Sequence, residues 1–585
     1  MARSARLSRS GHPDGAAMTT PLQPAATLQR RRRLMLALNV ATWLALTGGA
    51  AVLLGAGGWT SAEVALLGCV AWVFLAPSID VWNTVVGLVL LHARSDGDLQ
   101  VAPFLTAADE RAPIRIRTAV LMTLRNEDVP RALLRLQTVK ASLDRTGEGD
   151  GFDYFVLSDT SDAAIAEEEE RRIARWHEAL GEAAGRVVYR RRAENTGYKA
   201  GNVRDFCERW GAGYELMVPL DADSLMSGTA VLELVRVLQR HPRIGILQTR
   251  VDGLPSATPL ARLLQLGGRG MRALVYGMAW RLADCGPYWG HNAAIRVAPF
   301  TRHCALPVLP GRPPFGGHLM SHDYAEAALM SGAGYEVRLF CRTQESWEDL
   351  PPTLTELLRR EIRWCRGNLQ YVGLLRRPDV AGTSRLNLAW LVLGYLALVA
   401  QTGVLALLPV ATWQAGDARP AVVAVSALLL LQAPRALGAL DVLLTPGAAA
   451  SLGGPLRTAA SSAAELRFHG LVSPVSALTV SSAIAQMLLT RRAAGWGGQQ
   501  RDARAVSWGE ALAAFWPHTL FGVAVTAAMW LASPALCLAT LPWVGGPLLA
   551  VPLAVATAHP RLARLVPEAP PTAPEVAAVV AGVAG

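Results

Sequence analysis

Apolar residues are concentrated in six long runs. A transmembrane helix needs about 20 apolar residues, and each run exceeds that length. The runs cover residues 34–54, 64–91, 387–409, 421–444, 511–531 and 534–557. The first contains no charged residue, and the second contains only Asp80. The pattern predicts six membrane-spanning helices in three pairs, with seven or eight as alternatives.

A further apolar segment, residues 471–489, is ambiguous. It contains Pro474 and several Ser and Thr residues, and it lies between Arg467 and the pair Arg491-Arg492. Basic residues at both ends favour a helix that lies in the cytoplasmic interface, or re-enters from it, over a helix that crosses the membrane.

Basic residues also orient the first pair of spans. Four arginines at positions 30–33 precede the first run, and an arginine-rich region follows the second. Because positively charged loops stay in the cytoplasm, both are expected there. The short link at 412–420 is nearly uncharged, as is typical of a periplasmic turn. The first run is too long for a signal peptide and a second follows it, so we interpret it as a retained anchor.

Composition excludes several classes of protein. With 51% apolar and 17% charged residues, the chain is unlike an ordinary soluble enzyme. The net charge of +10 is explained by cytoplasmic loops facing anionic lipid, and no nucleic acid partner is expected. The seven cysteines include no Cys-x-x-Cys pair, so neither a structural zinc site nor a disulfide framework is expected.

Between residues 92 and 350, strand and helix patterns alternate. Strands are expected at 117–123, 154–157, 187–189, 216–220 and 244–248, and a long helix is expected near 260–278. Such alternation predicts an α/β domain with a mostly parallel sheet and helices on both faces.

One strand carries the clearest chemical signal. The apolar residues 216–220 are followed by Asp221, Ala222 and Asp223. In an extended chain residues i and i+2 point to the same side, so the two carboxylates converge beyond the strand's carboxyl end, where open α/β sheets bind ligands. Mg²⁺ or Mn²⁺ bridging the pair to a substrate diphosphate would relieve their repulsion. A solvated turn or a helix cap is the alternative.

Polar residues recur at the ends of other strands. Glu127 follows the first strand, Asp159 follows the second, and Lys199 lies between Gly197 and Gly201 in the loop after the third. Each has an ordinary alternative. Glu127 could lie in a turn, Asp159 could cap the helix that follows it, and Lys199 could be a solvated loop lysine. Their repetition at successive strand ends favours a nucleotide-binding site.

The tripeptide Ser321-His322-Asp323 is typical of a helix N-terminus, where the helix dipole stabilises an aspartate. We expect His322 to be a packed or exposed histidine rather than a metal ligand.

These motifs form a familiar series: Asp159, Lys199-Ala200-Gly201-Asn202, Asp221-Ala222-Asp223, Gly290-His291-Asn292, Ser321-His322-Asp323 and Arg360-x-x-Arg363-Trp364. The series resembles the processive family 2 glycosyltransferases with a GT-A fold, which include cellulose and hyaluronan synthases. Within that family, residues 288–293, 303–306, 363–365 and 506–512 are similar to the members that make the linear β-1,2-glucan backbone of osmoregulated periplasmic glucans.

The chain departs from the family pattern at three places. Arg360 stands where the family usually has Gln, and Ser321-His322-Asp323 stands where cellulose synthases have Thr-Glu-Asp. The loop that carries Lys199 also differs from the longer basic loop of other members.

The resemblance implies a role for each motif. Asp323 would be the general base. The donor would be bound by Glu127, Asp159, Lys199, Asn202 and Asp221, and a Mg²⁺ or Mn²⁺ ion by Asp221 and Asp223. The acceptor would be bound by Trp289, His291, Arg360, Arg363 and Trp364.

It also implies a function: inverting, processive transfer of glucose from UDP-glucose to a growing β-1,2-glucan at the bacterial inner membrane. The alternatives are a synthase of another β-glycan, of the cellulose or hyaluronan type, and a non-catalytic scaffold or glucan exporter. A scaffold needs none of the three aspartate motifs, which argues against that reading. Expected partners are UDP-glucose, the glucan chain and the bilayer, with an acyl carrier protein and a periplasmic glucan-processing protein as further candidates.

The expected fold is therefore a multi-span α-helical membrane protein with a cytoplasmic α/β GT-A (Rossmann-like) glycosyltransferase domain. Its parts would be a basic cytoplasmic tail (1–33), a transmembrane hairpin (34–91), the GT-A domain (92–350), interfacial helices (351–386), a transmembrane pair (387–444), a cytoplasmic or interfacial segment (445–510), a second transmembrane pair (511–558) and a C-terminal tail (559–585).

Overall fold

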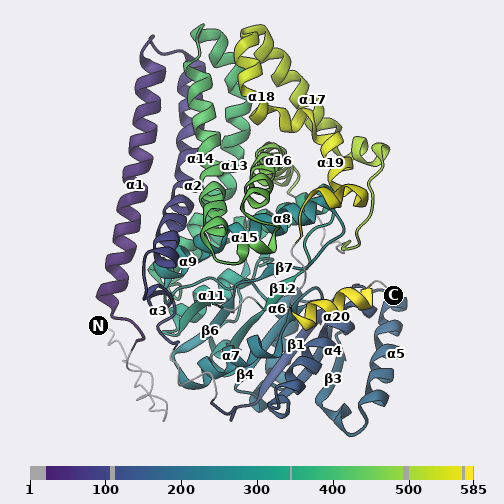
Figure 1. The fold of residues 1–585 in the computed structure, drawn as a ribbon. Helices are drawn as coiled ribbons and strands as arrows, with labels where there is room; N and C mark the ends of the chain where they lie inside the picture. Colours follow the sequence, from purple (N-terminus) through teal and green to yellow (C-terminus); the bar gives the residue numbers. More distant parts are fainter. Residues whose placement is uncertain (1–20, 106–111, 343–344, 492–499, 569–572, 584–585) are drawn as a thin grey trace.

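The computed structural model describes residues 21–105, 112–342, 345–491, 500–568 and 573–583. Long helices stand side by side on one side of an α/β domain (Figure 1). The fold class expected from the sequence is confirmed: apolar helices of spanning length accompany an α/β domain built on a central sheet.

Five of the six expected spans are single helices. They are α1 (Ala25–Gly55), α2 (Ser61–His92), α13 (Gly382–Ala415), α14 (Arg419–Leu444) and α17 (Trp508–Ala532). The sixth expected span is two helices, α18 (Pro534–Leu548) and α19 (Ala550–Ala558), bent by 66°. Pro547 and the adjacent glycines account for the break, because proline lacks the backbone N–H that continues a helix and glycine is a poor helix former.

The ambiguous segment 471–489 lies inside one continuous helix, α16 (Pro455–Thr490). This helix is long and apolar enough to cross a membrane. Its start follows α15 (Ala448–Ser451) and Leu452, which packs against Leu266 of α8 (Pro259–Gly270). Shortly after its end, Arg501 contacts Glu127 of the α/β domain. Met487, near the end of α16, belongs to the hydrophobic cluster that includes Ala119 and Leu121 of the α/β domain, so both ends of the helix lie beside that domain. The interfacial placement stays a prediction.

The α/β domain is built on a seven-stranded sheet of order β11-β6-β8-β4-β1-β2-β3. Its strands are β1 (Thr118–Leu124), β2 (Phe152–Ser158), β3 (Val187–Arg191), β4 (Leu216–Asp221), β6 (Ile244–Thr249), β8 (Ala293–Arg296) and β11 (Glu336–Phe340). Only β8 runs antiparallel to its neighbours within this sheet. The expected mostly parallel sheet is confirmed, although β8 and β11 gave no clear sequence signal.

Side chains on the two faces of the sheet enter two different hydrophobic clusters. Val120 and Met122 of β1 point into one cluster, and Ala119 and Leu121 point into the other. This alternation is the period of two that extended chain imposes. The covering helices are α4 (Val129–Arg145), α5 (Ala163–Leu180), α6 (Tyr198–Arg209), α7 (Gly228–Arg240), α10 (Val297–His303) and α11 (Asp323–Gly332).

Short elements complete the domain. The segments β5 (Leu225–Met226), β12 (Ser346–Glu348) and β7 (Asp252–Gly253) form a three-stranded sheet, and β9 (Val308–Leu309) pairs with β10 (Gly317–His318). Helix α3 (Gly97–Val101) follows α2.

The prediction of one long helix near 260–278 is wrong. The segment is divided at Met271 into α8 and α9 (Arg272–Leu282). Gly270, the last residue of α8, lies against Gly438 of α14, where a Cβ on Gly438 would come within 2.0 Å of the Gly270 carbonyl oxygen. The glycines that permit this approach also weaken the helix at that point.

The amphipathic helix α12 (Leu354–Leu369), which begins at the cap Thr353, packs against α13, α16 and α19. At the end of the chain, α20 (Pro574–Val583) packs on α4, where Glu575 accepts hydrogen bonds from Ser142 at 2.5 Å and Arg145 at 2.7 Å. The expected C-terminal tail therefore folds, in part, onto the α/β domain.

Candidate active site

One large cavity, of about 1170 Å³, opens at the carboxyl ends of β1, β2 and β4. It extends to residues of α2, α13 and α14, such as Val73, Gln401 and Leu431. Every site residue expected from the sequence lines it: Glu127, Asp159, Lys199, Asn202, Asp221, Asp223, Trp289, His291, Asp323, Arg360, Arg363 and Trp364. Residues spread over more than 230 positions of the chain thus share one chamber.

Asp221, the last residue of β4, is held by Lys199. The lysine lies in the first turn of α6, just after Gly197, which adopts a φ of 72°. Its ammonium forms an ion pair with Asp221 and donates to the Gly290 carbonyl oxygen at 2.8 Å. Burial alone would raise the pKa of Asp221, but the charges of Lys199 and His291 outweigh it and hold the pKa below its usual value.

Asp223 and Glu127 share a guanidinium that sequence patterns did not reveal. The Nε of Arg501 lies 3.3 Å from an Asp223 oxygen, and its Nη1 donates to Glu127 at 2.9 Å. Burial raises the pKa of Asp223, and the charge of Asp221 raises it further against the effect of Arg501. Burial likewise raises the pKa of Glu127 to about 7. Only the position of Arg501, just before the motif at 506–512, could have pointed to it.

Asp159 does not cap the helix that follows it, so that alternative is wrong. Asp162 caps α5 by accepting from Ala164 and Ile165. Arg192 instead donates through Nε and Nη2 to the two oxygens of Asp159, both at 2.7 Å. This bidentate pair fixes the carboxylate at the cavity wall.

Asn202 is bonded mainly within the protein. Its amide donates to the Leu157 carbonyl oxygen at 2.9 Å and accepts from Arg190 at 2.6 Å. These bonds tie α6 to β2 and β3. A role in donor binding stays a prediction for this residue.

Asp323 is the first residue of α11, as the sequence indicated. The Tyr371 hydroxyl lies 3.5 Å from its carboxylate and donates to the Ser321 carbonyl oxygen at 3.0 Å. His322 lies 2.8 Å from Glu326, which raises the pKa of His322 against the effect of burial. This histidine is thus paired with Glu326 at the cavity wall.

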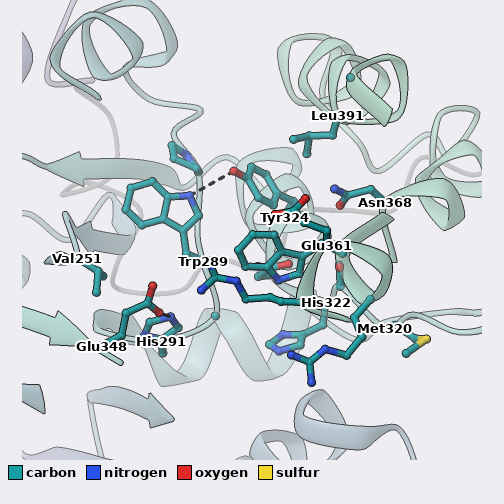
Figure 2. A pocket seen from close by; sticks show the side chains of 18 of the residues that line it. Val251, Trp289, His291, Met320, His322, Tyr324, Glu348, Glu361, Asn368 and Leu391 are labelled. Atoms are coloured by element: carbon teal, nitrogen blue, oxygen red, sulfur yellow. Dashed lines mark hydrogen bonds and ion pairs between the residues drawn. The ribbon is translucent and has the colours of Figure 1, made fainter. Parts of the chain in front are cut away.

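His291 lies on the side of the cavity that holds the aspartate pair. Its Nδ1 is 3.1 Å from the Ser224 hydroxyl, and its Nε2 is 3.4 Å from Glu348 (Figure 2). Burial alone would lower its pKa, but Glu348 and Asp221 raise the pKa to about 9, so the ring is a cation at neutral pH.

Trp289, Tyr324 and Trp364 form an aromatic wall of the cavity. The Trp289 indole donates to the Tyr324 hydroxyl at 3.2 Å (Figure 2). On α12 the Arg360 guanidinium lies over the Trp364 ring, 4.7 Å from its centre. Trp364 is 46% exposed, so much of its surface is open for contact with a ligand.

Comparisons with known proteins agree on one family. A family profile described as "Glycosyl transferase family group 2" matches residues 216–433. Proteins named "Glucans biosynthesis glucosyltransferase H" are similar over most of their length. The one from Caulobacter vibrioides is 36% identical and covers 94% of this chain and 87% of its own. The one from Xanthomonas campestris pv. campestris is 34% identical and covers 89% of this chain and 82% of its own.

Among solved structures, a mannosyltransferase from Pyrobaculum calidifontis, in complex with GDP-Man and Mn²⁺, covers 70% of this chain and all of its own. The two are 17% identical, and the TM-score is 0.38. At that level the similarity carries no structural conclusion.

Proposed function

The chain belongs to the family of glucans biosynthesis glucosyltransferase H, and from this premise we propose that it transfers glucose from UDP-glucose to a growing β-1,2-glucan, processively and with inversion. The protein is a glycosyltransferase of glucan biosynthesis. The observation that carries the finer proposal is the convergence of Asp159, the pair Asp221 and Asp223, and Asp323 on one cavity that continues among the membrane helices.

On the donor side, the proposal assigns the uridine to Asp159 and the diphosphate to the region of Asp221 and Asp223. Arg192 supports this by fixing the orientation of Asp159. Lys199 and His291 add positive charge beside Asp221, which favours an anionic donor.

The aspartate pair suits a divalent cation such as Mg²⁺ or Mn²⁺. Asp223 is buried and Asp221 is partly exposed, and the charge of Asp221 raises the cost of ionising Asp223. Within the described residues, no group of three or more His, Cys, Asp or Glu side chains is arranged so that it could hold a metal ion by itself. Two carboxylates are nevertheless enough for such an ion when substrate phosphate oxygens complete its coordination. When bound, the ion would offset the charge that develops on the departing UDP.

On the acceptor side, Asp323 would take the proton from the acceptor hydroxyl as that oxygen attacks the anomeric carbon. Attack opposite UDP converts an α-linked donor into a β-linkage. Asp323 is the first residue of α11 and lines the cavity, so its carboxylate is placed where an acceptor hydroxyl can reach it. Trp364 would pack its ring against the acceptor sugar, and Arg360 and Arg363 would donate to hydroxyls or phosphate.

The proposal also places the enzyme in the bacterial inner membrane with its α/β domain in the cytoplasm. The arginines at 30–33 ahead of α1 support this orientation. UDP-glucose, the glucan and the bilayer are the proposed partners. An acyl carrier protein and a periplasmic glucan-processing protein stay candidates on the family resemblance alone.

The test compares wild type with Asp323→Asn as purified full-length proteins. Asparagine keeps the size of the side chain and can still lie at a helix start. Loss of a general base should reduce glucan synthesis by about 10²–10⁴-fold, while UDP binding is retained. Glucan synthesis is measured from UDP-glucose, and linkage analysis of the product distinguishes β-1,2-glucan from other β-glycans.

Asp150→Asn, at a fully exposed turn, is the matched control and should keep wild-type activity. A chelator should stop wild-type synthesis, and added Mn²⁺ should restore it. Full synthesis by Asp323→Asn would remove Asp323 as the base. Loss of both synthesis and UDP binding would indicate misfolding.

A further inference from the structure

Helix α12 presents two different faces to the cavity. Glu356, Arg360 and Arg363 line the cavity on the donor side, where the charges of Arg501 and Glu127 act on Arg363 and the charge of Arg360 acts on Glu348. Glu361, Trp364 and Asn368 follow at intervals of three and four residues, so they share the adjacent face. That face lies toward α13, because the charge of Glu361 and the side chain of Asn368 both act on Tyr395.

Glu361 is the unexplained member of this second face. Its side chain lines the cavity, yet it makes no hydrogen bond or ion pair with any residue in the part of the chain that the structure describes. Burial raises the pKa of its carboxyl, and only the neighbouring Arg360 opposes this effect. The side chain is half-buried and its carboxylate faces the cavity, so its oxygens are open to the hydrogen-bond donors that a ligand brings.

The surroundings of Glu361 are suited to a sugar. Figure 2 shows Trp289, Tyr324, Glu361 and Asn368 around the same hollow, and all four line the cavity. Aromatic rings offer flat apolar surfaces to the C–H face of a pyranose, while a carboxylate and an amide bind its hydroxyls. A hard cation would require several oxygen ligands, and Glu361 is the only carboxylate that α12 presents on this face.

The position of this hollow relates it to the acceptor rather than to the donor. Tyr324 directly follows Asp323, the proposed base, and its hydroxyl accepts from Trp289 at 3.2 Å. The nearby Leu391 and Tyr395 belong to α13, one of the candidate membrane helices. The hollow therefore lies beside the proposed base and the candidate membrane helix α13.

We propose that Glu361, together with Asn368, forms a subsite for the terminal glucosyl unit of the acceptor glucan. The carboxylate accepts hydrogen bonds from hydroxyls that are not being glycosylated and so holds the attacking hydroxyl toward Asp323. This inference rests on the proposed function and adds to it a specific acceptor contact. It makes Glu361 a determinant of acceptor binding that leaves donor binding unaffected.

The test uses full-length Glu361→Gln, which keeps the size of the side chain but removes its charge and one acceptor oxygen. Hydrogen bonds to charged groups are strong enough that the rate of glucan synthesis should fall by about 10- to 100-fold. The KM for UDP-glucose and the Kd for UDP should stay within about twofold of wild type, since the donor side is untouched. Free glucose released by hydrolysis is measured alongside, because loss of acceptor binding increases its share of the turnover.

Glu208→Gln, an exposed carboxylate on α6, is the matched control and should behave as wild type. Wild-type synthesis by Glu361→Gln would overturn the subsite, and so would a rise in the KM for UDP-glucose that accounts for the whole loss. If the Glu361→Gln protein fails to bind UDP, the same measurements are repeated with Glu361→Asp. The proposal then expects an intermediate loss of synthesis, and full synthesis overturns it. Failure of the wild type to make glucan would instead count against the proposed function.

Discussion

At the scale of single residues, the site is organised by positive charges around the aspartate pair. Lys199 and His291 lie beside Asp221, and Arg501 lies between Asp223 and Glu127. These cations reduce the repulsion between buried carboxylates and keep Asp221 ionised. The same arrangement presents positive charge where the diphosphate of a nucleotide sugar is proposed to bind.

The charge of His291 should make stability depend on pH. Its pKa of about 9 in the folded protein exceeds the ordinary value of 6.5, so its contribution is fully present below pH 6.5 and is lost as pH rises through 9. The contribution should be roughly 1–3 kcal/mol. Thermal unfolding of wild type and His291→Gln in detergent, at pH 6.5 and pH 9.5, should show the difference between them shrinking at high pH. A constant difference would contradict a charged His291.

At the scale of elements, glycines set how closely the α/β domain approaches the membrane helices. A Cβ on Gly87 of α2 would lie 1.7 Å from the Ala273 carbonyl oxygen of α9, and one on Gly277 of α9 would lie 1.8 Å from the Asn83 carbonyl oxygen of α2. The two helices therefore touch backbone to backbone. Because α2 and α9 both line the cavity, their contact also shapes its wall.

Gly87→Ala should separate these helices and destabilise the protein by about 1–3 kcal/mol, the usual cost of overpacking. Gly68→Ala in the same helix is the control, since nothing lies within 4 Å of its Cβ position. That change should be neutral or stabilise by up to about 1 kcal/mol, because alanine favours helix more than glycine does. Thermal unfolding midpoints in detergent measure both, and equal midpoints would disprove the close contact.

At the scale of the whole molecule, the cavity joins two environments. It begins at the strand ends of the α/β domain and ends among residues of α2, α13 and α14. Helix α12 lines the cavity and packs against α13 and α16, whereas α20 packs on α4. The proposed transfer site and residues of the candidate membrane helices thus line one continuous cavity.

Orientation can be tested with reporters fused after Arg94, which follows α2, and after Asp417, in the turn between α13 and α14. The arginines at 30–33 predict that the Arg94 site is cytoplasmic and the Asp417 site periplasmic. A cytoplasmic reporter should be active only at Arg94, and alkaline phosphatase only at Asp417. The reverse pattern would invalidate the topology and the cytoplasmic location of the site.

The sequence by itself determined the features that depend on local order. Apolar runs located five spanning helices, and the pattern at 216–220 located β4 (Leu216–Asp221) together with its aspartates. Asp323 was correctly placed at a helix start. Hydrophobic length and periodicity are properties of neighbouring residues, so they can be read before the chain is folded.

Tertiary structure alone decided which distant residues meet. Packing of Gly270 against Gly438 accompanies the break in the expected helix at 260–278, and the 66° bend divides the last expected span. Arg501 reaches Glu127 across 374 positions. The half-buried carboxylate of Glu361, which has no hydrogen-bond partner among the described residues, also became evident only when its surroundings were assembled. Such contacts depend on how elements pack, which no local pattern records, because each needs a partner far away in the sequence.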